Sequence, residues 1–131
     1  VETDNINDMY KFKTPALRNV SLTAPYGHNG AYPTLKSIIK HHLNPIKMNK
    51  NWKPEYANLP KATWLEEIDF VTFSDKREQD RILSSIDIQP IELNDKEIDE
   101  LVSFLKSLTG RSGNQRPLGK PDKVPSGLSI D

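Results

Sequence analysis

The strongest periodic pattern of apolar residues lies near the end of the chain, over residues 95–108. Its members recur at helical spacing and would form one stripe: Ile98, Leu101, Val102, Leu105 and Leu108. Asn94 precedes the run as an N-cap, and Glu97 follows three residues later, where it completes a capping box. Gly110 comes after the run and favours a left-handed termination. The pattern predicts a helix from Asp95 to Leu108.

A second helix is predicted from Thr34 to about Leu43, because Thr34 is a good N-cap and Asn44-Pro45 is a stop signal. The apolar face of this helix carries Leu35, Ile38 and Ile39. The residue seven positions after Leu35, on the same face, is His42. His41 lies about 100° around the helix axis, toward the polar side. We therefore expect His42 to be the buried histidine.

The remaining segments carry weaker patterns. Residues 1–33 have three X-Pro steps and an Asn29-Gly30 turn, which favour an ordered loop, and long ordered loops usually have a function. Residues 45–73 are interpreted as a loop with a short helix near Thr63–Asp69, and another helix is predicted from Ser74 to about Ser85. The predicted organisation is a loop region, a helical region and an extended tail: residues 1–33, 34–110 and 111–131.

Composition limits the classes of protein that this chain can represent. Its 131 residues suit one domain or one lobe of a larger domain, and 35% hydrophobic residues with ten prolines make a lean core. A large apolar cofactor or a neighbouring lobe would supply the missing contacts. Eighteen basic residues balance eighteen acidic ones, so we expect no nucleic-acid partner. No apolar run approaches the ~20 residues of a membrane span.

The chain contains no cysteine, which excludes disulfides, thiolate metal sites and a Cys-x-x-Cys-His haem attachment motif within it. The start, Val1-Glu2-Thr3-Asp4, has no pattern of a signal peptide. It reads as the interior of a longer protein, and we expect any export signal to lie upstream.

Three histidines are the main candidates for chemistry: His28, His41 and His42. A buried His42 would need a partner, because a buried polar group without one costs about 1–3 kcal/mol. Haem iron is one such partner and a buried carbonyl is another. His28 lies in a glycine-flanked turn, and Arg18 lies in the proline-bounded loop. Each is either a structural or solvated group, or a hydrogen-bond partner of a buried anion such as a haem propionate.

Other kinds of site fit the sequence poorly. Adjacent His41 and His42 diverge by about 100° on a helix, so they chelate one zinc ion badly. No His-Glu-x-x-His motif and no phosphate-binding glycine loop occur. Ser37 and His41 are four residues apart, but no orienting acid lies beside them, which argues against nucleophilic catalysis.

The stretch from Tyr10 to Leu35, YKFKTPALRNVSLTAPYGHNGAYPTL, strongly resembles a signature of the second domain of bacterial di-haem cytochrome c peroxidases. The related di-haem oxidases of methylamine utilisation share it. The run from Leu93 to Thr109, LNDKEIDELVSFLKSLT, resembles the closing helix of the same domain, and the VPSGL tail from Val124 to Leu128 is similar to the ends of some members. These stretches cover somewhat over a third of the chain, in the family's order.

The resemblance implies an all-α, cytochrome c-like fold and a periplasmic protein. It implies a c-type haem, attached through an upstream Cys-x-x-Cys-His motif, and reduction of hydrogen peroxide with electrons from a small donor protein, a cytochrome or a cupredoxin. The lobe resembled here packs the electron-entry haem. The partners implied are the upstream haem-bearing portion of the same protein and, in some cases, a second copy in a homodimer. The peroxide-handling residues would lie upstream, so this chain alone should be inactive.

The resemblance also implies roles for individual residues. In the family, the position fourteen residues after the turn histidine is the axial ligand of the electron-entry haem, usually methionine or tyrosine, and here it is His42. Imidazole in place of a thioether should lower the haem potential. Met48 is a rival ligand. His28 and Arg18 match positions near haem, and propionate contacts are expected for both.

The family also binds calcium through backbone carbonyls in a Leu-Thr-x-Pro-Tyr segment, which corresponds here to Thr23 and Pro25. Three functions remain in competition: a di-haem peroxidase or oxidase lobe, an electron-transfer lobe with bis-histidine haem, and a haem-free binding module.

Overall fold

The computed structural model describes residues 4–59, 68–111 and 125. Five α-helices occur in this part of the chain: α1 (Leu35–Leu43), α2 (Pro45–Asn51), α3 (Val71–Ser74), α4 (Lys76–Ser84) and α5 (Asp95–Ser107). Four single 3₁₀ turns accompany them: η1 (Ile6–Asp8), η2 (Val20–Leu22), η3 (His28–Gly30) and η4 (Pro54–Tyr56). Extended pairing in the described ranges is limited to one antiparallel bridge between Tyr26 and Tyr32. The all-α prediction is confirmed, whereas the cytochrome c-like arrangement stays a prediction.

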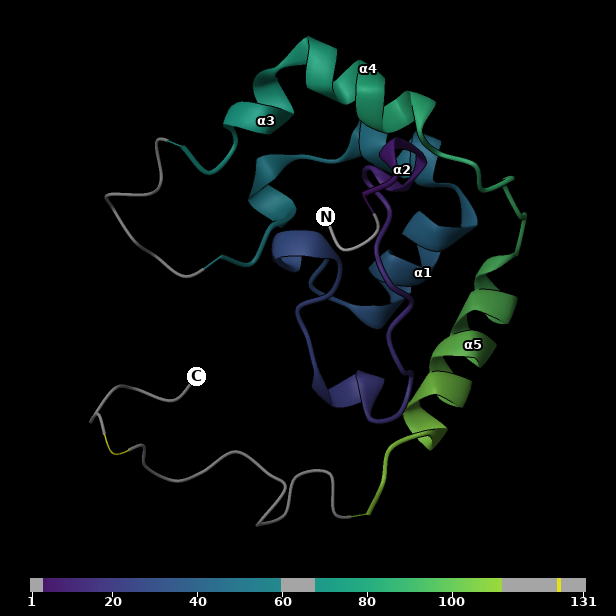
Figure 1. Ribbon diagram of the computed structural model, residues 1–131. Coiled ribbons are helices and arrows are strands. Elements are labelled where there is room, and N and C mark those ends of the chain that lie inside the picture. The colour runs from purple at the N-terminus through teal and green to yellow at the C-terminus, as the bar shows by residue number, and fades with distance from the viewer. Residues whose placement is uncertain (1–3, 60–67, 112–124, 126–131) are drawn as a thin grey trace.

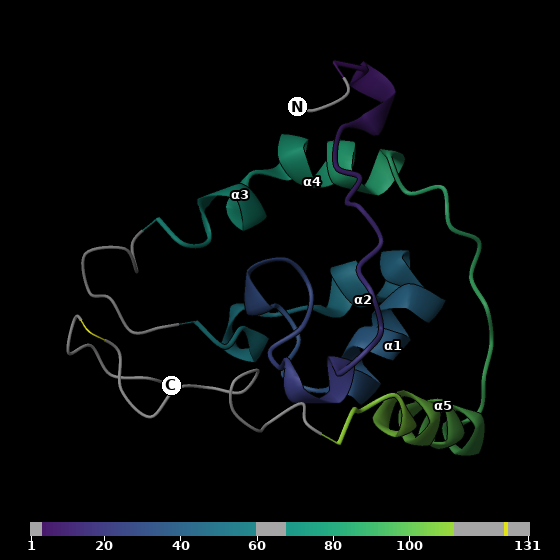
Figure 2. The same ribbon diagram turned by 60° about the horizontal axis from the view of Figure 1, so that its bottom comes forward.

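The helices are arranged around α1 and α2, which lie at the centre of Figure 1. Helix α5 packs along one side of α1, and α3 and α4 run across the far side of α2. The N-terminal segment crosses from α4 toward η2, as Figure 2 shows. Its Tyr10 hydroxyl donates to Glu78 Oε2 of α4 at 2.7 Å, and Lys11 Nζ lies 2.7 Å from Asp87 Oδ2.

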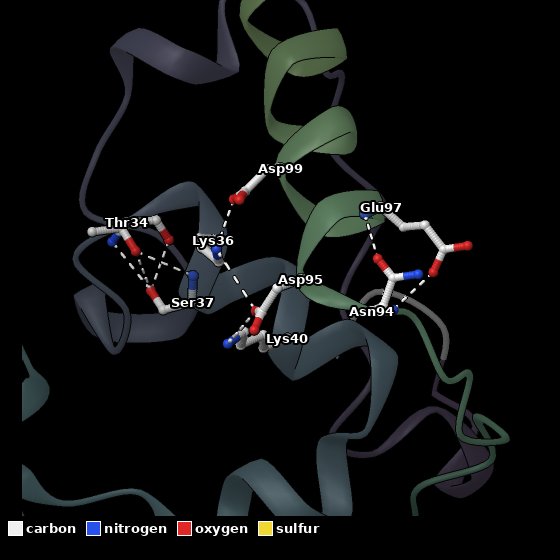
Figure 3. A network of polar contacts seen from close by, with 8 residues as sticks. All are labelled: Thr34, Lys36, Ser37, Lys40, Asn94, Asp95, Glu97 and Asp99. Atoms are coloured by element: carbon white, nitrogen blue, oxygen red, sulfur yellow. Dashed lines mark hydrogen bonds and ion pairs between the residues drawn. The ribbon is translucent and has the colours of Figure 1, made fainter.

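Helix α1 begins as the sequence predicts. Thr34 adopts an extended conformation, its hydroxyl accepts a hydrogen bond from the backbone N–H of Ser37, and Ser37 Oγ accepts one in return from the Thr34 backbone N–H. These reciprocal bonds form a capping box, which stabilises the first turn of the helix. Figure 3 shows this cap beside the equivalent cap of α5.

Asn44 separates α1 from α2 and belongs to the caps of both helices. Its backbone N–H donates to Lys40 O at 3.2 Å, and its Oδ1 accepts from the Lys47 backbone N–H at 2.9 Å. The prediction of a loop after Asn44-Pro45 is wrong here, because α2 begins at Pro45. Proline is well tolerated at the first helical position, since its missing N–H would have no intrahelical partner there.

Helix α5 has the predicted start but a different end. Asn94 Oδ1 accepts from the Glu97 N–H at 3.0 Å, and Glu97 Oε2 accepts from the Asn94 N–H at 2.8 Å. The predicted left-handed termination at Gly110 is wrong, because positive φ among the described glycines occurs only at Gly27 and Gly30. Gly110 instead donates its N–H to Asn19 Oδ1 at 2.7 Å, which ties the end of α5 to the loop region.

A row of charges also links α1 and α5 at the surface (Figure 3). Lys36 Nζ lies 2.6 Å from Asp99 Oδ1, and Asp95 Oδ1 lies 3.8 Å from Lys36 Nζ and 3.5 Å from Lys40 Nζ. The bond to Asp99 raises the pKa of Lys36. The two aspartates are largely exposed and the two lysines are partly exposed, so each pair is screened by solvent and adds little to stability.

The predicted helix from Ser74 to Ser85 is present as α4, with α3 as a separate turn before it. The predicted helix near Thr63–Asp69 and the tail after Arg111 fall mainly outside the described residues. None of the described helices combines the length and the apolar composition that a membrane crossing requires.

The hydrophobic core of the described residues is small. Tyr26, Tyr32 and Leu35 form its centre, at 6–8% exposure, and Val102 and Leu105 of α5 pack against them. Ile98 is the most buried side chain, at 4% exposure. Other apolar side chains remain open to solvent, among them Leu101 and Phe104 on α5. Of the predicted stripe, Ile98 is buried, Leu101 is exposed, and the others are partly buried: Val102, Leu105 and Leu108.

Candidate functional site

A tight loop between Tyr26 and Tyr32 forms the base of the candidate site. The backbone N–H of each tyrosine donates to the carbonyl of the other, at 2.7 and 3.0 Å, and this closes the loop. Gly27 and Gly30 have φ values of 76° and 66°, a region that side chains with a Cβ rarely adopt. A Cβ at Gly30 would also lie 3.0 Å from the Asn58 carbonyl oxygen, so both the backbone and the space require glycine.

A cleft of about 780 Å³ lies between this loop, the last turns of α1, the end of α2 and residues 69–79. Its volume is within the range of roughly 300–1,000 Å³ typical of cofactor and ligand sites. Aromatic and apolar side chains line much of it: Tyr32, Ile38, Trp52, Leu59, Phe70 and Phe73. The polar groups include two imidazoles, those of His28 and His41. The cleft thus combines apolar and aromatic side chains with two imidazoles.

His41 is the half-buried histidine of the cleft. Its Nδ1 lies 2.9 Å from the Tyr32 hydroxyl oxygen, and the two rings have their centroids 5.1 Å apart. Burial lowers the pKa of the imidazole, and the charge of neighbouring His42 lowers it further. Burial also raises the pKa of the Tyr32 hydroxyl. The neutral imidazole is therefore favoured, and this is the form that binds transition metals.

His42, in contrast, is exposed to solvent, and the prediction that it would be the buried histidine is wrong. The side of α1 that faces the core and the cleft carries Leu35, Ile38 and His41, at steps of three residues. Leu35 is buried, and the other two are partly buried. The sequence pattern of Leu35, Ile38 and Ile39 is compatible with either ridge. His42, one residue further around the helix, lies outside this ridge. Exposure does not test the iron-ligand role, which stays a prediction.

The other predicted site residues are divided between two places. His28 and Pro25 line the cleft with His41, and the His28 ring stacks on Phe12 with centroids 4.8 Å apart. Arg18 is exposed and lies near Gly110, away from the cleft lining. Thr23 is also outside the cleft, and its hydroxyl donates to Val20 O at 3.0 Å. The structure therefore does not bring Arg18 and His28 together.

Met48, the rival iron ligand, packs against the hydrophobic core as a partly buried side chain. It is not among the residues that line the cleft. Its position on α2 is explained by packing, because the thioether fills space beside the aromatic core.

Sequence reasoning missed Trp52 and the pairing of Tyr32 with His41. Trp52 Nε1 donates to Ala31 O at 2.9 Å, and its ring packs on Phe73 with centroids 5.1 Å apart. Helical spacing could have found one signal, since His41 continues the three-residue ridge from Leu35. The contact between Tyr32 and His41 depends on the conformation of the glycine loop and has no local signature.

The residues of the cleft fit a haem better than a bare metal ion. Within residues 4–59 and 68–111, no group of three or more His, Asp or Glu side chains is placed to hold a metal. A haem would need only one iron ligand from this lobe, because its ring supplies four nitrogens. The apolar and aromatic walls suit a flat macrocycle, and His41 offers a neutral imidazole.

Comparison with known proteins identifies relatives of the chain. No family model and no solved structure matches it. It is similar to the methylamine utilization protein MauG of Paracoccus denitrificans (strain Pd 1222), with 36% identity over 104 residues, 77% of this chain and 23% of MauG. MauG of Methylophilus methylotrophus is 33% identical over 64 residues, 49% of this chain and 19% of that protein. Cytochrome-c peroxidase IdrP1 of Denitromonas iodatirespirans is 47% identical over 38 residues, 29% of this chain and 10% of that protein.

These matches relate the chain to a class of haem redox proteins, in agreement with the resemblance of its loop region. More specifically, the chain is a homologue of MauG and IdrP1 in the di-haem peroxidase family, at modest identity and over part of its length. It spans only 23% of the Paracoccus protein and 10% of the Denitromonas protein.

Proposed function

We propose that this chain is the C-terminal, haem-holding lobe of a di-haem peroxidase-like oxidoreductase. The observation that carries the proposal is the match to MauG, which extends over 77% of the chain. The cleft supports it, because its aromatic walls and its imidazoles suit a haem. The haem c would be attached through a Cys-x-x-Cys-His motif in an upstream segment, since this chain has no cysteine.

The upstream haem-bearing portion of the same protein is the proposed main partner. Few apolar side chains of the described residues are buried, namely Tyr26, Tyr32, Leu35, Pro45 and Ile98. Leu101 and Phe104 are 38% and 55% exposed on α5, and Phe12 and Leu17 are also open to solvent. Exposed apolar surface of this kind is typical of an interface with another protein segment. Association with an upstream lobe would bury these side chains and complete the core.

The proposed reaction is reduction of hydrogen peroxide with electrons from a small periplasmic donor protein, with this lobe around the electron-entry haem. The name of IdrP1, a cytochrome-c peroxidase, supports this choice, whereas the longer match to MauG supports a MauG-like oxidase as the alternative. When bound, the haem supplies the redox-active iron. The residues of this chain would enclose the ring, exclude water and provide one axial ligand.

The axial ligand proposed from sequence spacing is His42, fourteen residues after His28. Its exposure is compatible with this role if the haem is carried by a different segment, because the ligand would then face that segment. His28 and Arg18 are proposed to bind the haem propionates. Both side chains are exposed and thus accessible to carboxylates from outside the chain.

The decisive experiment uses the intact protein, with its upstream segment. An absorbance spectrum with a Soret band and c-type α bands is expected, together with turnover of peroxide by reduced donor. A c-type spectrum without turnover would favour the electron-transfer lobe with bis-histidine haem. The absence of any haem spectrum would contradict the proposal and favour a haem-free binding module.

Calcium binding by the backbone carbonyls of Thr23 and Pro25 is the second part of the proposal. Both residues are exposed and lie next to the Tyr26–Tyr32 loop, so an ion there could join this lobe to another. Removing calcium from the intact protein with a chelator is expected to lower activity or dimerisation, and added calcium should restore both. Full activity in excess chelator would exclude this site.

A further inference from the structure

The charge of this chain is unevenly distributed, although its formal sum is zero. No aspartate or glutamate occurs between Asp8 and Glu55, so all eighteen acidic residues lie outside this stretch. The stretch includes most of the loop region, α1 and α2, and it carries eight basic residues: Lys11, Lys13, Arg18, Lys36, Lys40, Lys47, Lys50 and Lys53. A one-sided distribution of this kind produces a local positive potential, which attracts partners of negative charge.

Ion pairs within the chain compensate the lysines of α1 but not those of α2. The two lysines of α1 lie 2.6–3.8 Å from acidic side chains at the start of α5. Within residues 4–59 and 68–111, no such pair is present for the three cations that follow: Lys47, Lys50 and Lys53. Helix α2 therefore carries positive charge that the described part of the chain does not balance.

The lysines of α2 lie on the side of the helix that points away from the core. Pro45 is buried and Met48 is partly buried, which defines the inner side of α2. At about 100° per residue, Ile46, Lys47 and Lys50 fall within an arc of about 100° on the opposite side. All three are exposed, Ile46 at 37%. We call these three residues the lysine face.

The lysine face adjoins the proposed iron ligand. His42 is exposed and lies three residues before Pro45, where α2 begins. Ile91 also reaches this junction, because its backbone N–H donates to Leu43 O at 2.9 Å, and its side chain is 59% exposed. Uncompensated positive charge and exposed apolar side chains thus occur beside the residue proposed to contact the iron.

We propose that the small electron-donor protein docks on the lysine face, with His42 and Ile91 at the edge of the contact, and that this donor presents an acidic patch around a small apolar centre. The inference rests on the proposed function, because a donor is needed only if this lobe packs the electron-entry haem. It adds the place of docking and the charge of the partner. A donor bound here would lie close to the iron that His42 is proposed to ligate, and electron transfer slows steeply with distance.

The chemistry of the lysine face suits a transient partner. Its cations are lysines, which act as hydrated point charges and lack the bidentate geometry of arginine. Charges of this kind raise the rate of association more than the affinity. Helix α2 has only seven residues, so the contact is small, and electron-transfer complexes have the smallest interfaces among specific protein pairs. A second copy of this chain is the competing occupant, since its own acidic residues could face the lysines.

Electron transfer from two donors of opposite charge to the intact protein tests the proposal. The probes are an acidic and a basic single-haem cytochrome c of similar potential, each reduced and mixed with the protein and hydrogen peroxide in a stopped-flow instrument. At about 10 mM ionic strength, where the Debye length is about 30 Å, we expect the acidic donor to have the larger second-order rate constant. This rate constant should fall as salt is added, whereas that of the basic donor should rise.

Reversal of two charges tests the location. The double variant Lys47→Glu with Lys50→Glu should lower the rate constant of the acidic donor by about tenfold or more at low salt, and the neutral pair Lys47→Gln with Lys50→Gln should lower it less. The matched control on α5 is Lys96→Glu with Lys106→Glu, which changes the net charge equally at two exposed positions and should lower the rate less than about threefold. Turnover with hydroquinone, a neutral small reductant, should be unchanged in all variants.

Several results would overturn the proposal and leave the proposed function intact. One is a faster reaction with the basic donor at low salt, and another is a rate constant of the acidic donor that does not depend on salt. Equal losses in the α2 and α5 variants would show an effect of net charge alone. A dimer in analytical ultracentrifugation that the α2 substitutions dissociate would assign the lysine face to a second copy. A protein without haem, or without turnover by any of the three reductants, would instead contradict the proposed function.

Discussion

Leu35 is the side chain whose removal should best reveal how α1 is held in place. It lies at the first turn of α1, at 8% exposure, between Tyr26 and Tyr32. Leu→Ala substitutions in protein cores cost about 2–5 kcal/mol, and the cost is lower where the surroundings can collapse into the cavity. Because this core is small and the side chains around Leu35 are mostly only partly buried, we expect Leu35→Ala to lower the local stability of α1 by about 2–3 kcal/mol.

Amide hydrogen exchange in the intact protein measures this cost locally. If α1 exchanges through local opening, a loss of 2–3 kcal/mol accelerates exchange by about 30- to 150-fold, at 1.4 kcal/mol for each factor of ten. The peptides covering residues 35–43 should show this change. Ile46→Ala is the matched control, because Ile46 is 37% exposed on α2 and its removal should change exchange in residues 45–51 by about twofold or less.

Equal effects of the Leu35 and Ile46 substitutions in their own helices would refute the reasoning. So would an acceleration below about threefold at residues 35–43, since it corresponds to well under 1 kcal/mol. Either result would mean that the contacts around Leu35 do not hold α1 in the intact protein.

Two further predictions concern the ends of the described fold. Asn94→Ala should lower the stability of α5 by about 0.5–2 kcal/mol and accelerate amide exchange in its first turn, whereas Asn94→Asp should preserve the cap and leave exchange nearly unchanged. Equal exchange rates in the two variants would contradict the capping role. The hydrogen bond from Tyr10 lowers the pKa of the Glu78 carboxyl, so this contact contributes above the ordinary carboxyl pKa and is lost as the pH falls through the lowered value. We therefore expect amide exchange in residues 4–13 to rise on acidification in the wild-type protein, after correction for the intrinsic pH dependence of exchange. In Tyr10→Phe the exchange should already be high at neutral pH. A wild-type profile without this transition would exclude the contact.

The starts of the helices were predictable because their signals are local. Asn94 and Glu97 form a capping box from side chains three residues apart, and no distant residue is needed. The end of α5 could not be predicted, because Gly110 is bonded to Asn19, which is ninety-one positions away in the sequence. Proline in Asn44-Pro45 was misleading, since the same residue can stop one helix or begin the next.

In the candidate site, too, features with a local sequence signal were predictable and features that depend on distant contacts were not. The importance of the turn around His28 was predictable from its glycines, and the two positive φ values at Gly27 and Gly30 agree with it. The face of α1 that becomes buried was not predictable, because the four apolar residues among its nine positions are compatible with two ridges. Contacts with α2 and Trp52 select one of them, and these contacts join segments whose approach no short pattern encodes.

Asn44 is shared by two helices. Its backbone N–H donates to Lys40 O in the last turn of α1, and its side chain caps the first turn of α2. Because no free linker separates α1 from α2, removal of this one side chain would leave the start of α2 without its cap and the junction between the helices less fixed.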